Sequence, residues 1–211
     1  MLKTTLMPSN TNVPSVWVLP QVQFVTHSNS SKFQLKKTSQ HPKQEPEQRN
    51  QYHLKLRFYK KMGYQMVYID ESGFAQTVHR PKGYAPIGRR CYATYDWQIR
   101  KQTNAIGALL NGRLFTVALF HHTINRAVFI QWLKEDLIPK LNKKSVLIMD
   151  NARFHVGEEI RQLVAQSGHK LLYLPAYSPD LNPIEQYWAY AKNTRRKYMI
   201  SDIEILFDRY L

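Results

Sequence analysis

The stretch VLIMDN, residues 146–151, is an apolar run that closes on a carboxylate, which is how a buried strand ends. The stretch VYIDESGF at residues 67–74 repeats this pattern. SPDLNPIE at residues 178–185 instead puts its last carboxylate in the first turn of an expected helix. Because ligands meet open α/β sheets beyond the ends of their strands, these three settings predict a sheet with carboxylates gathered at its edge.

We select Asp70, Asp150 and Glu185 as the carboxylates of this site. Asp70 and Glu71 are neighbours in one strand, so their side chains point to opposite faces and only one can readily enter a shared site. Asp70 directly ends the apolar run, which favours it over Glu71. Glu185 follows Asp150 by 35 positions, which leaves room for a helix, a strand and a loop to return the chain to the same edge.

The rest of the sequence predicts the elements around these acids. Asn111-Gly112 is the strongest hairpin signal in the chain. In order, we expect strands at 65–70 and 74–79 joined by a turn at Ser72-Gly73, strands at 103–110 and 114–120, a helix at 124–141, a strand at 145–150, a helix at 156–167, a strand at 170–174, a helix at 183–197, and a last short helix capped by Ser201 or Asp202. Hairpins followed by alternating strands and helices predict an α/β fold, a mixed sheet covered by helices, in the element order of the ribonuclease H-like fold.

Two regions precede the first expected strand. Residues 1–48 lack periodicity and are rich in Ser, Thr, Asn, Gln and Pro, which predicts a poorly ordered tail or linker. Residues 49–62 have the spacing of a basic amphipathic helix. We therefore expect a catalytic domain at 49–211 that includes this helix and follows a tail at 1–48.

The composition points to a polyanionic partner. The chain has 30 Lys and Arg against 15 Asp and Glu, a formal net charge of +15, and nucleic acid is the commonest partner for such a balance. Cys91 is the only cysteine, which excludes an intrachain disulfide and a thiolate zinc site and suits a reducing cytoplasm. The apolar stretch at 13–25 is too short and too polar to span a bilayer, so we expect no membrane association.

Three carboxylates in a basic protein fit magnesium-dependent phosphoryl transfer on nucleic acid. Two divalent ions about 4 Å apart can activate an attacking oxygen and stabilise a leaving oxygen, and Mg²⁺ prefers oxygen ligands. Each acid also fits a structural role. Asp70 and Asp150 are possible turn formers after strands, and Glu185 completes a capping box with Asn182 as cap and Pro183 at the first helical position.

At these residues the chain resembles the transposases of the mariner superfamily, in particular its bacterial insertion-sequence branch. The resemblance covers residues 34–210, and the stretch at 174–185 is its most specific part. The matching text is YIDESGF at 68–74, Gly83 to Gly88, LIMDN at 147–151 with His155, and LPAYSPDLNPIE at 174–185.

This resemblance implies an Asp-Asp-Glu catalytic domain in which Asp70, Asp150 and Glu185 bind two Mg²⁺ ions, with Mn²⁺ as a substitute. It implies that water first nicks the transposon end and that the new 3′-hydroxyl then attacks target DNA, typically at TA. Asn151 and His155 match positions beside the second aspartate and would support the site; as a turn former and a helix-start residue they also have structural explanations. The resemblance leaves open whether the protein forms a homodimer.

The resemblance does not extend to the start of the chain. Members of the family carry an N-terminal helix-turn-helix region that reads the transposon ends, and residues 1–33 show no such pair of helices. Either another reading frame encodes this region or this copy is truncated. Two alternatives follow: another ribonuclease H-like nuclease that hydrolyses without strand transfer, and an inactive DNA-binding remnant of a transposase.

Two groups of cations are candidates for contacts with the DNA backbone. The first lies in a loop rich in Gly and Pro, and the second follows Glu185 along its helix, where the alternative is an ordinary solvated helix end. The two groups are Lys82, Arg89 and Arg90, and Lys192, Arg195, Arg196 and Lys197.

Overall fold

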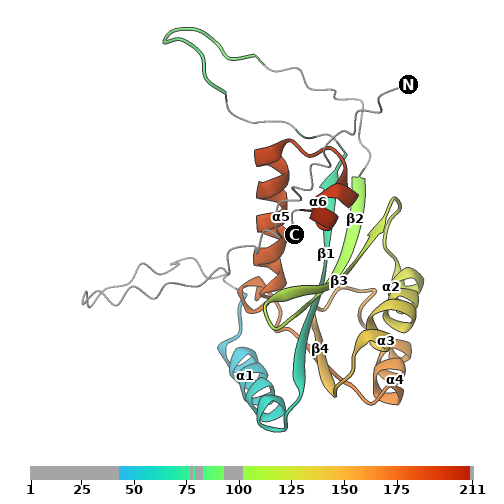
Figure 1. Ribbon diagram of the computed structural model, residues 1–211. Coiled ribbons are helices and arrows are strands. Elements are labelled where there is room, and N and C mark those ends of the chain that lie inside the picture. The colour runs from blue at the N-terminus through green and yellow to red at the C-terminus, as the bar shows by residue number, and fades with distance from the viewer. Residues whose placement is uncertain (1–42, 77, 79–82, 93–101, 210–211) are drawn as a thin grey trace, which may run out of the picture. The chain divides into compact units, whose positions relative to one another are not determined.

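A five-stranded sheet organises the part of the chain that the computed structural model describes, which is residues 43–76, 78, 83–92 and 102–209. Figure 1 shows the arrangement of its elements. Its strands stand in the order β3-β2-β1-β4-β5. β4 is parallel to both β1 and β5, whereas β2 is antiparallel to β1 and to β3. The bounds are β1 Gln65–Ala75, β2 Gln102–Leu110, β3 Arg113–Phe120, β4 Ser145–Met149 and β5 Lys170–Tyr173. The predicted mixed sheet is confirmed.

Local sequence explains most of these strands. Every residue of β4 is buried, as its continuous apolar run predicts for a strand covered on both faces. β2 and β3 form the predicted hairpin, in which Asn111 and Gly112 have φ angles of 52° and 75°. Two successive positive φ angles are the mark of the type I′ turn, which Asn-Gly favours.

The first strand differs from the prediction. We expected a strand to end at Asp70 and a turn at Ser72-Gly73, but β1 continues without a break to Ala75. Ser72 and Gly73 pair with Ala105 and Asn104 of β2, so the hairpin partner extends the strand past the residues that would form a turn in isolation. Asp70 consequently lies inside the central strand and not at its end.

Helices cover both faces of the sheet (Figure 1). Helices α2, α3 and α4, with a π-helical turn η1 between the first two, pack on the face that holds Val67 and Ile69. Helices α1, α5 and α6 cover the other face, over Tyr68 and Phe74. Their bounds are α1 Pro46–Lys61, α2 Arg126–Trp132, η1 Leu133–Leu137, α3 Ile138–Lys140, α4 Glu158–Gln166, α5 Ile184–Tyr198 and α6 Ile203–Arg209; a 3₁₀ turn, η2, spans Pro179–Leu181.

The ends of the helices follow from their capping residues. Asp202 caps α6, because its Oδ1 accepts hydrogen bonds from the backbone N–H of Glu204 at 2.8 Å and of Ile205 at 3.5 Å. Helix α1 starts at Pro46, inside the predicted tail, because proline suits the first turn of a helix. Residues 1–42 of that tail lie outside the described residues. No helix in the described part of the chain is long and apolar enough to cross a bilayer.

Candidate active site

Asp70 lies on the central strand, level with Asp150. The parallel register pairs Tyr68 with Ile148, so two residues further along Asp70 stands beside Asp150, which directly follows β4. Asp70 points to the face that α5 covers, because it shares its parity in the strand with Tyr68. Glu71 points to the opposite face. The structure thus puts Asp70, and not Glu71, on the sheet face that is covered by α5, the helix that carries Glu185.

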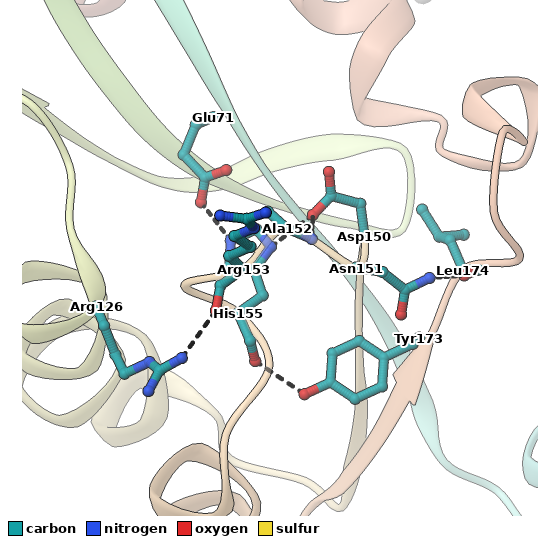
Figure 2. Close-up of polar contacts among 9 residues, drawn as sticks. All are labelled: Glu71, Arg126, Asp150, Asn151, Ala152, Arg153, His155, Tyr173 and Leu174. Carbon is teal, nitrogen blue, oxygen red and sulfur yellow. Dashed lines mark hydrogen bonds and ion pairs between the residues drawn. The ribbon is translucent and has the colours of Figure 1, made fainter.

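A histidine bridges Asp150 and Glu71 (Figure 2). The ring of His155 is fully buried; its Nδ1 lies 2.6 Å from Oδ1 of Asp150 and its Nε2 lies 2.8 Å from Oε1 of Glu71. Both partners are carboxylates that can only accept when ionised, so both ring nitrogens donate and the ring is an imidazolium. One cation therefore joins two acids from neighbouring strands.

The segment that carries Asp150 and His155 is held at several points (Figure 2). Arg126 Nη2 donates to the carbonyls of Arg153 and Val156, both at 2.8 Å, and Tyr173 Oη donates to the carbonyl of His155 at 2.8 Å. Asn151 Nδ2 donates to the carbonyl of Leu174 at 2.7 Å, which is a structural role beside the second aspartate. The loop between β4 and α4 is therefore fixed by directed hydrogen bonds on both sides.

These contacts set the charges of the bridge. Burial lowers the pKa of His155, but the hydrogen bonds to Asp150 and Glu71 outweigh burial and raise the pKa to about 9. The hydrogen bond from His155 lowers the pKa of Asp150, against the opposing effect of burial. Oδ1 of Asp150 also accepts from the backbone N–H of Ala152 at 2.9 Å. Among the described residues none donates to Oδ2, which leaves that oxygen for a ligand.

Glu185 stands on the first turn of α5 and is exposed. The helix has Pro183 at its N-cap and no hydrogen bond from a capping side chain. The backbone N–H of Glu185 donates to the carbonyl of Asn182 at 3.2 Å. The capping box with Asn182 as cap is therefore absent, which removes the structural role that the sequence allowed for Glu185.

The acids act on one another through space. Burial raises the pKa of Asp70 to about 7, with further contributions from the charges of Glu185, Glu71 and Asp150. The described residues nevertheless contain no group of three or more His, Cys, Asp or Glu side chains gathered closely enough to hold a metal ion. Carboxylates are negatively charged, hard oxygen donors, which is the kind of ligand that a hard divalent cation prefers.

Comparison with protein families identifies the chain. The family described as DDE superfamily endonuclease matches residues 65–206, which include all three selected acids. The chain belongs to this family. A search of the curated proteins found no significant match.

Solved structures of Mos1 transposase share the fold of this DDE endonuclease domain. The Mos1 paired-end complex with the left transposon end is 22% identical with a TM-score of 0.59, over 77% of this chain and 53% of the Mos1 chain. The Mos1 strand transfer complex is 22% identical with a TM-score of 0.59, over 76% of this chain and 52% of the Mos1 chain. The catalytic domain of Mos1 mariner transposase is 19% identical with a TM-score of 0.51, over 77% of this chain and 78% of that chain. The chain thus spans about half the length of Mos1 in the complexes and most of its catalytic domain.

The predicted DNA-contacting cations of the DDE endonuclease domain are exposed, buried or outside the described residues. Arg89, Arg90, Lys192, Arg196 and Lys197 are exposed, as a contact with phosphate requires. Lys82 lies outside the described residues.

Arg195 corrects the prediction. It is 5% exposed, and its guanidinium donates to the carbonyls of Ile200, Ala75, Gln76 and Ser201. A side chain buried among four acceptors cannot reach DNA, so Arg195 holds the fold together.

Sequence reasoning missed the contacts that hold this domain's second aspartate. Glu71 was set aside because it faces away from Asp70, and its bond to His155 spans 84 residues. Arg126 and Tyr173 act on backbone carbonyls that are 18 to 30 residues away. The sequence signal was the match of His155 to a family position beside Asp150, and no local pattern indicates its second partner.

Proposed function

We propose that this chain is the catalytic domain of a mariner-superfamily transposase of the bacterial insertion-sequence branch, and that it cuts and joins DNA in the cytoplasm. One observation carries the proposal: Asp70 and Glu185 lie on facing elements of a DDE endonuclease fold, and Asp150 stands level with Asp70 at the end of the neighbouring strand. Mos1 transposase has been solved with its left transposon end and as a strand transfer complex, which supports DNA as substrate and partner of this chain.

Asp70, Asp150 and Glu185 would hold two Mg²⁺ ions, or Mn²⁺ in their place. Mos1 structures with Mg and with Mn support a divalent metal. When bound, such ions activate an attacking oxygen and stabilise the leaving oxygen of a phosphodiester. His155 positions Asp150 by holding Oδ1, so that Oδ2 faces the site in one orientation. Glu71 acts only through His155, as the acceptor on the other side of the ring.

The proposed reaction has two displacements at phosphorus. Water first breaks the bond between phosphorus and the 3′-oxygen at the transposon end, which leaves a 3′-hydroxyl. That hydroxyl then attacks a target phosphodiester, typically at TA; a new phosphodiester forms, and the 3′-oxygen of the cut target strand leaves as a hydroxyl. No bond between protein and DNA forms in either step.

The exposed cations would bind the DNA backbone without reading its sequence. Arg89 and Arg90 would do so from the segment between β1 and β2, and Lys192, Arg196 and Lys197 from α5. Specific recognition of the transposon ends would come from a helix-turn-helix region encoded separately, and pairing of two ends from a homodimer.

A nicking assay on supercoiled plasmid tests the proposal. The parent protein should nick in Mg²⁺ and not in EDTA, and Asp150→Asn should lower the nicking rate roughly 10³-fold, because an amide cannot replace the charge that the ions require. Asp208→Asn, an exposed aspartate on α6, is the matched control and should nick like the parent. Nicking by Asp150→Asn at the parent rate would refute the assignment.

A second measurement separates transfer from hydrolysis. An oligonucleotide with a free 3′-hydroxyl should become joined to the plasmid when Mg²⁺ and protein are present. Nicking without joining would favour the alternative of a hydrolytic ribonuclease H-like nuclease. Binding without nicking would favour an inactive remnant.

A further inference from the structure

A glycine stands directly beside Asp70 in the sheet. Gly107 of β2 is the antiparallel partner of Asp70, and paired residues of antiparallel strands send their side chains to the same face. A Cβ atom at Gly107 would lie 2.7 Å from Cη2 and 2.9 Å from Cζ2 of Trp188. The indole of α5 therefore sits on bare backbone, immediately next to Asp70.

Trp188 is firmly seated at this point. It is 2% exposed, and the rings of Phe74 and Phe207 each pack against it edge-on, with centroids 6.2 Å from its own. Because protein interiors are close-packed, the largest side chain between a helix and a sheet sets how closely the two approach. Here that side chain meets the residue with no side chain, so α5 comes as close to the sheet as an indole ring allows.

We propose that Gly107 and Trp188 form a spacer that sets the distance between Asp70 and Glu185, and that both are positioning residues for this pair of carboxylates. The inference rests on the proposed function in that it takes these acids to act together. Asp70 belongs to the sheet and Glu185 to α5, so the packing of helix on sheet relates them. Trp188 is about one helical turn beyond Glu185, and Gly107 is the strand neighbour of Asp70, so this packing contact lies close in the chain or in the sheet to both acids.

The spacer keeps α5 in one position against the sheet. Catalytic groups tolerate little displacement, and an error of about 1 Å can cost about 10²-fold in rate.

Gly107→Ala is the direct test. The added methyl group is fixed to the backbone of β2 and would lie 2.7 and 2.9 Å from two ring atoms of Trp188, so the indole must shift, and we expect α5 to shift with it. We expect nicking to fall roughly 10²-fold, and the Mg²⁺ concentration that gives half of the maximal rise in melting temperature to increase about tenfold. The thermal measurement needs neither DNA nor turnover. Parent values for both in a folded Gly107→Ala protein would overturn the inference.

A second substitution should rescue the first. Phenylalanine is shorter than tryptophan and lacks the outer ring atoms that would collide with the methyl group, so Gly107→Ala with Trp188→Phe should nick at least about tenfold faster than Gly107→Ala alone. A purely structural role predicts the reverse, since Trp188→Phe removes packing and lowers stability. No gain in the double variant would overturn the spacer.

Two further arms keep the test decisive if Gly107→Ala does not fold. Trp188→Phe alone should raise the Mg²⁺ requirement several-fold, whereas Ile203→Ala, in the same apolar cluster but on α6, should lower the melting temperature without changing that requirement. Equal effects of the two would refute the spacer. A crystal structure of Gly107→Ala in which Glu185 keeps its parent distance from Asp70 would refute it as well, whether or not the protein proves to be a nuclease. Failure of the parent to nick would count against the proposed function alone.

Discussion

The contacts that hold Asp150 in place and those that hold Glu185 in place are of opposite kinds. The loop after β4 holds Asp150 with hydrogen bonds, from His155 and from the backbone N–H of Ala152, and is itself fixed by Arg126. The first turn of α5 lacks a capping hydrogen bond from a side chain, and apolar packing of Ile184 and Trp188 holds the helix on the sheet.

The difference separates two requirements of the proposed metal site. Hydrogen bonds are directional, so the polar support fixes which oxygen of Asp150 faces the site. Apolar packing has no preferred direction but resists changes in volume, so the support of Glu185 fixes a distance. Orientation and separation are thereby set at different acids, and each can be perturbed without the other.

Glu185→Gln should have the largest effect on activity and almost none on stability. The side chain is exposed and caps nothing, so its loss should leave the melting temperature within about 2 °C of the parent, whereas nicking should fall roughly 10³-fold through loss of the charge. Glu159→Gln, an exposed acid in the first turn of α4, is the matched control. Retained nicking in Glu185→Gln would return that residue to a purely structural role.

His155→Gln should damage both orientation and stability. It removes the buried cation between Asp150 and Glu71, which should cost about 3–5 kcal/mol in the free energy of unfolding, and nicking by the folded protein should fall about 10- to 100-fold. The control is His169→Gln, a buried histidine at the other end of β4 that accepts a hydrogen bond from the backbone N–H of Ser145. Equal losses of nicking in the two variants would mean that the polar support has no special link to the site.

The polar support should also respond to pH. The pKa of His155 is about 9 in the folded protein against an ordinary value of 6.5, so its contribution to stability is complete below pH 6.5 and is lost as the pH rises through 9. In EDTA, the free energy of unfolding should fall by on the order of 1–3 kcal/mol between pH 7 and pH 9.5. His155→Gln should lack this fall, and a parent protein with constant stability over that range would contradict the bridge.

Arg49→Ala should have the smallest effect. Its guanidinium makes two hydrogen bonds, of 3.0 and 2.7 Å, to Asp180 in η2, the turn just before α5. Both side chains are partly exposed, so the loss should be about 0.2–1 kcal/mol in stability and less than about threefold in nicking. A large loss of nicking would show that the support of Glu185 depends on polar contacts after all. Asp180→Asn in the same chain should add little to the effect of Arg49→Ala.

Local patterns predicted most elements and failed where distant contacts decide. The apolar run at 146–149 and the Asn111-Gly112 turn determine their own structure, so β4 and the hairpin were predictable. Ser72-Gly73 has the composition of a turn, yet pairing with β2 keeps it in a strand.

In the candidate site, too, local patterns predicted some residues and failed where distant contacts decide. Asp150 and Glu185 were selected from their immediate neighbours, but the bridge from His155 to Glu71 joins residues 84 positions apart. Arg195 was predicted on an exposed helix face, because nothing in α5 alone reveals the carbonyls of Ala75 and Gln76 that surround it.

Arg195 has a consequence for the way in which the protein opens. Its guanidinium joins the carbonyls of Ala75 and Gln76, at the end of β1, to those of Ile200 and Ser201, in the link between α5 and α6. Separating either end would leave a buried charge with only two of its four acceptors, which is unfavourable. The last residues of β1, the end of α5 and the whole of α6 should therefore open as one cooperative unit, and their amide protons should exchange with solvent at a common rate.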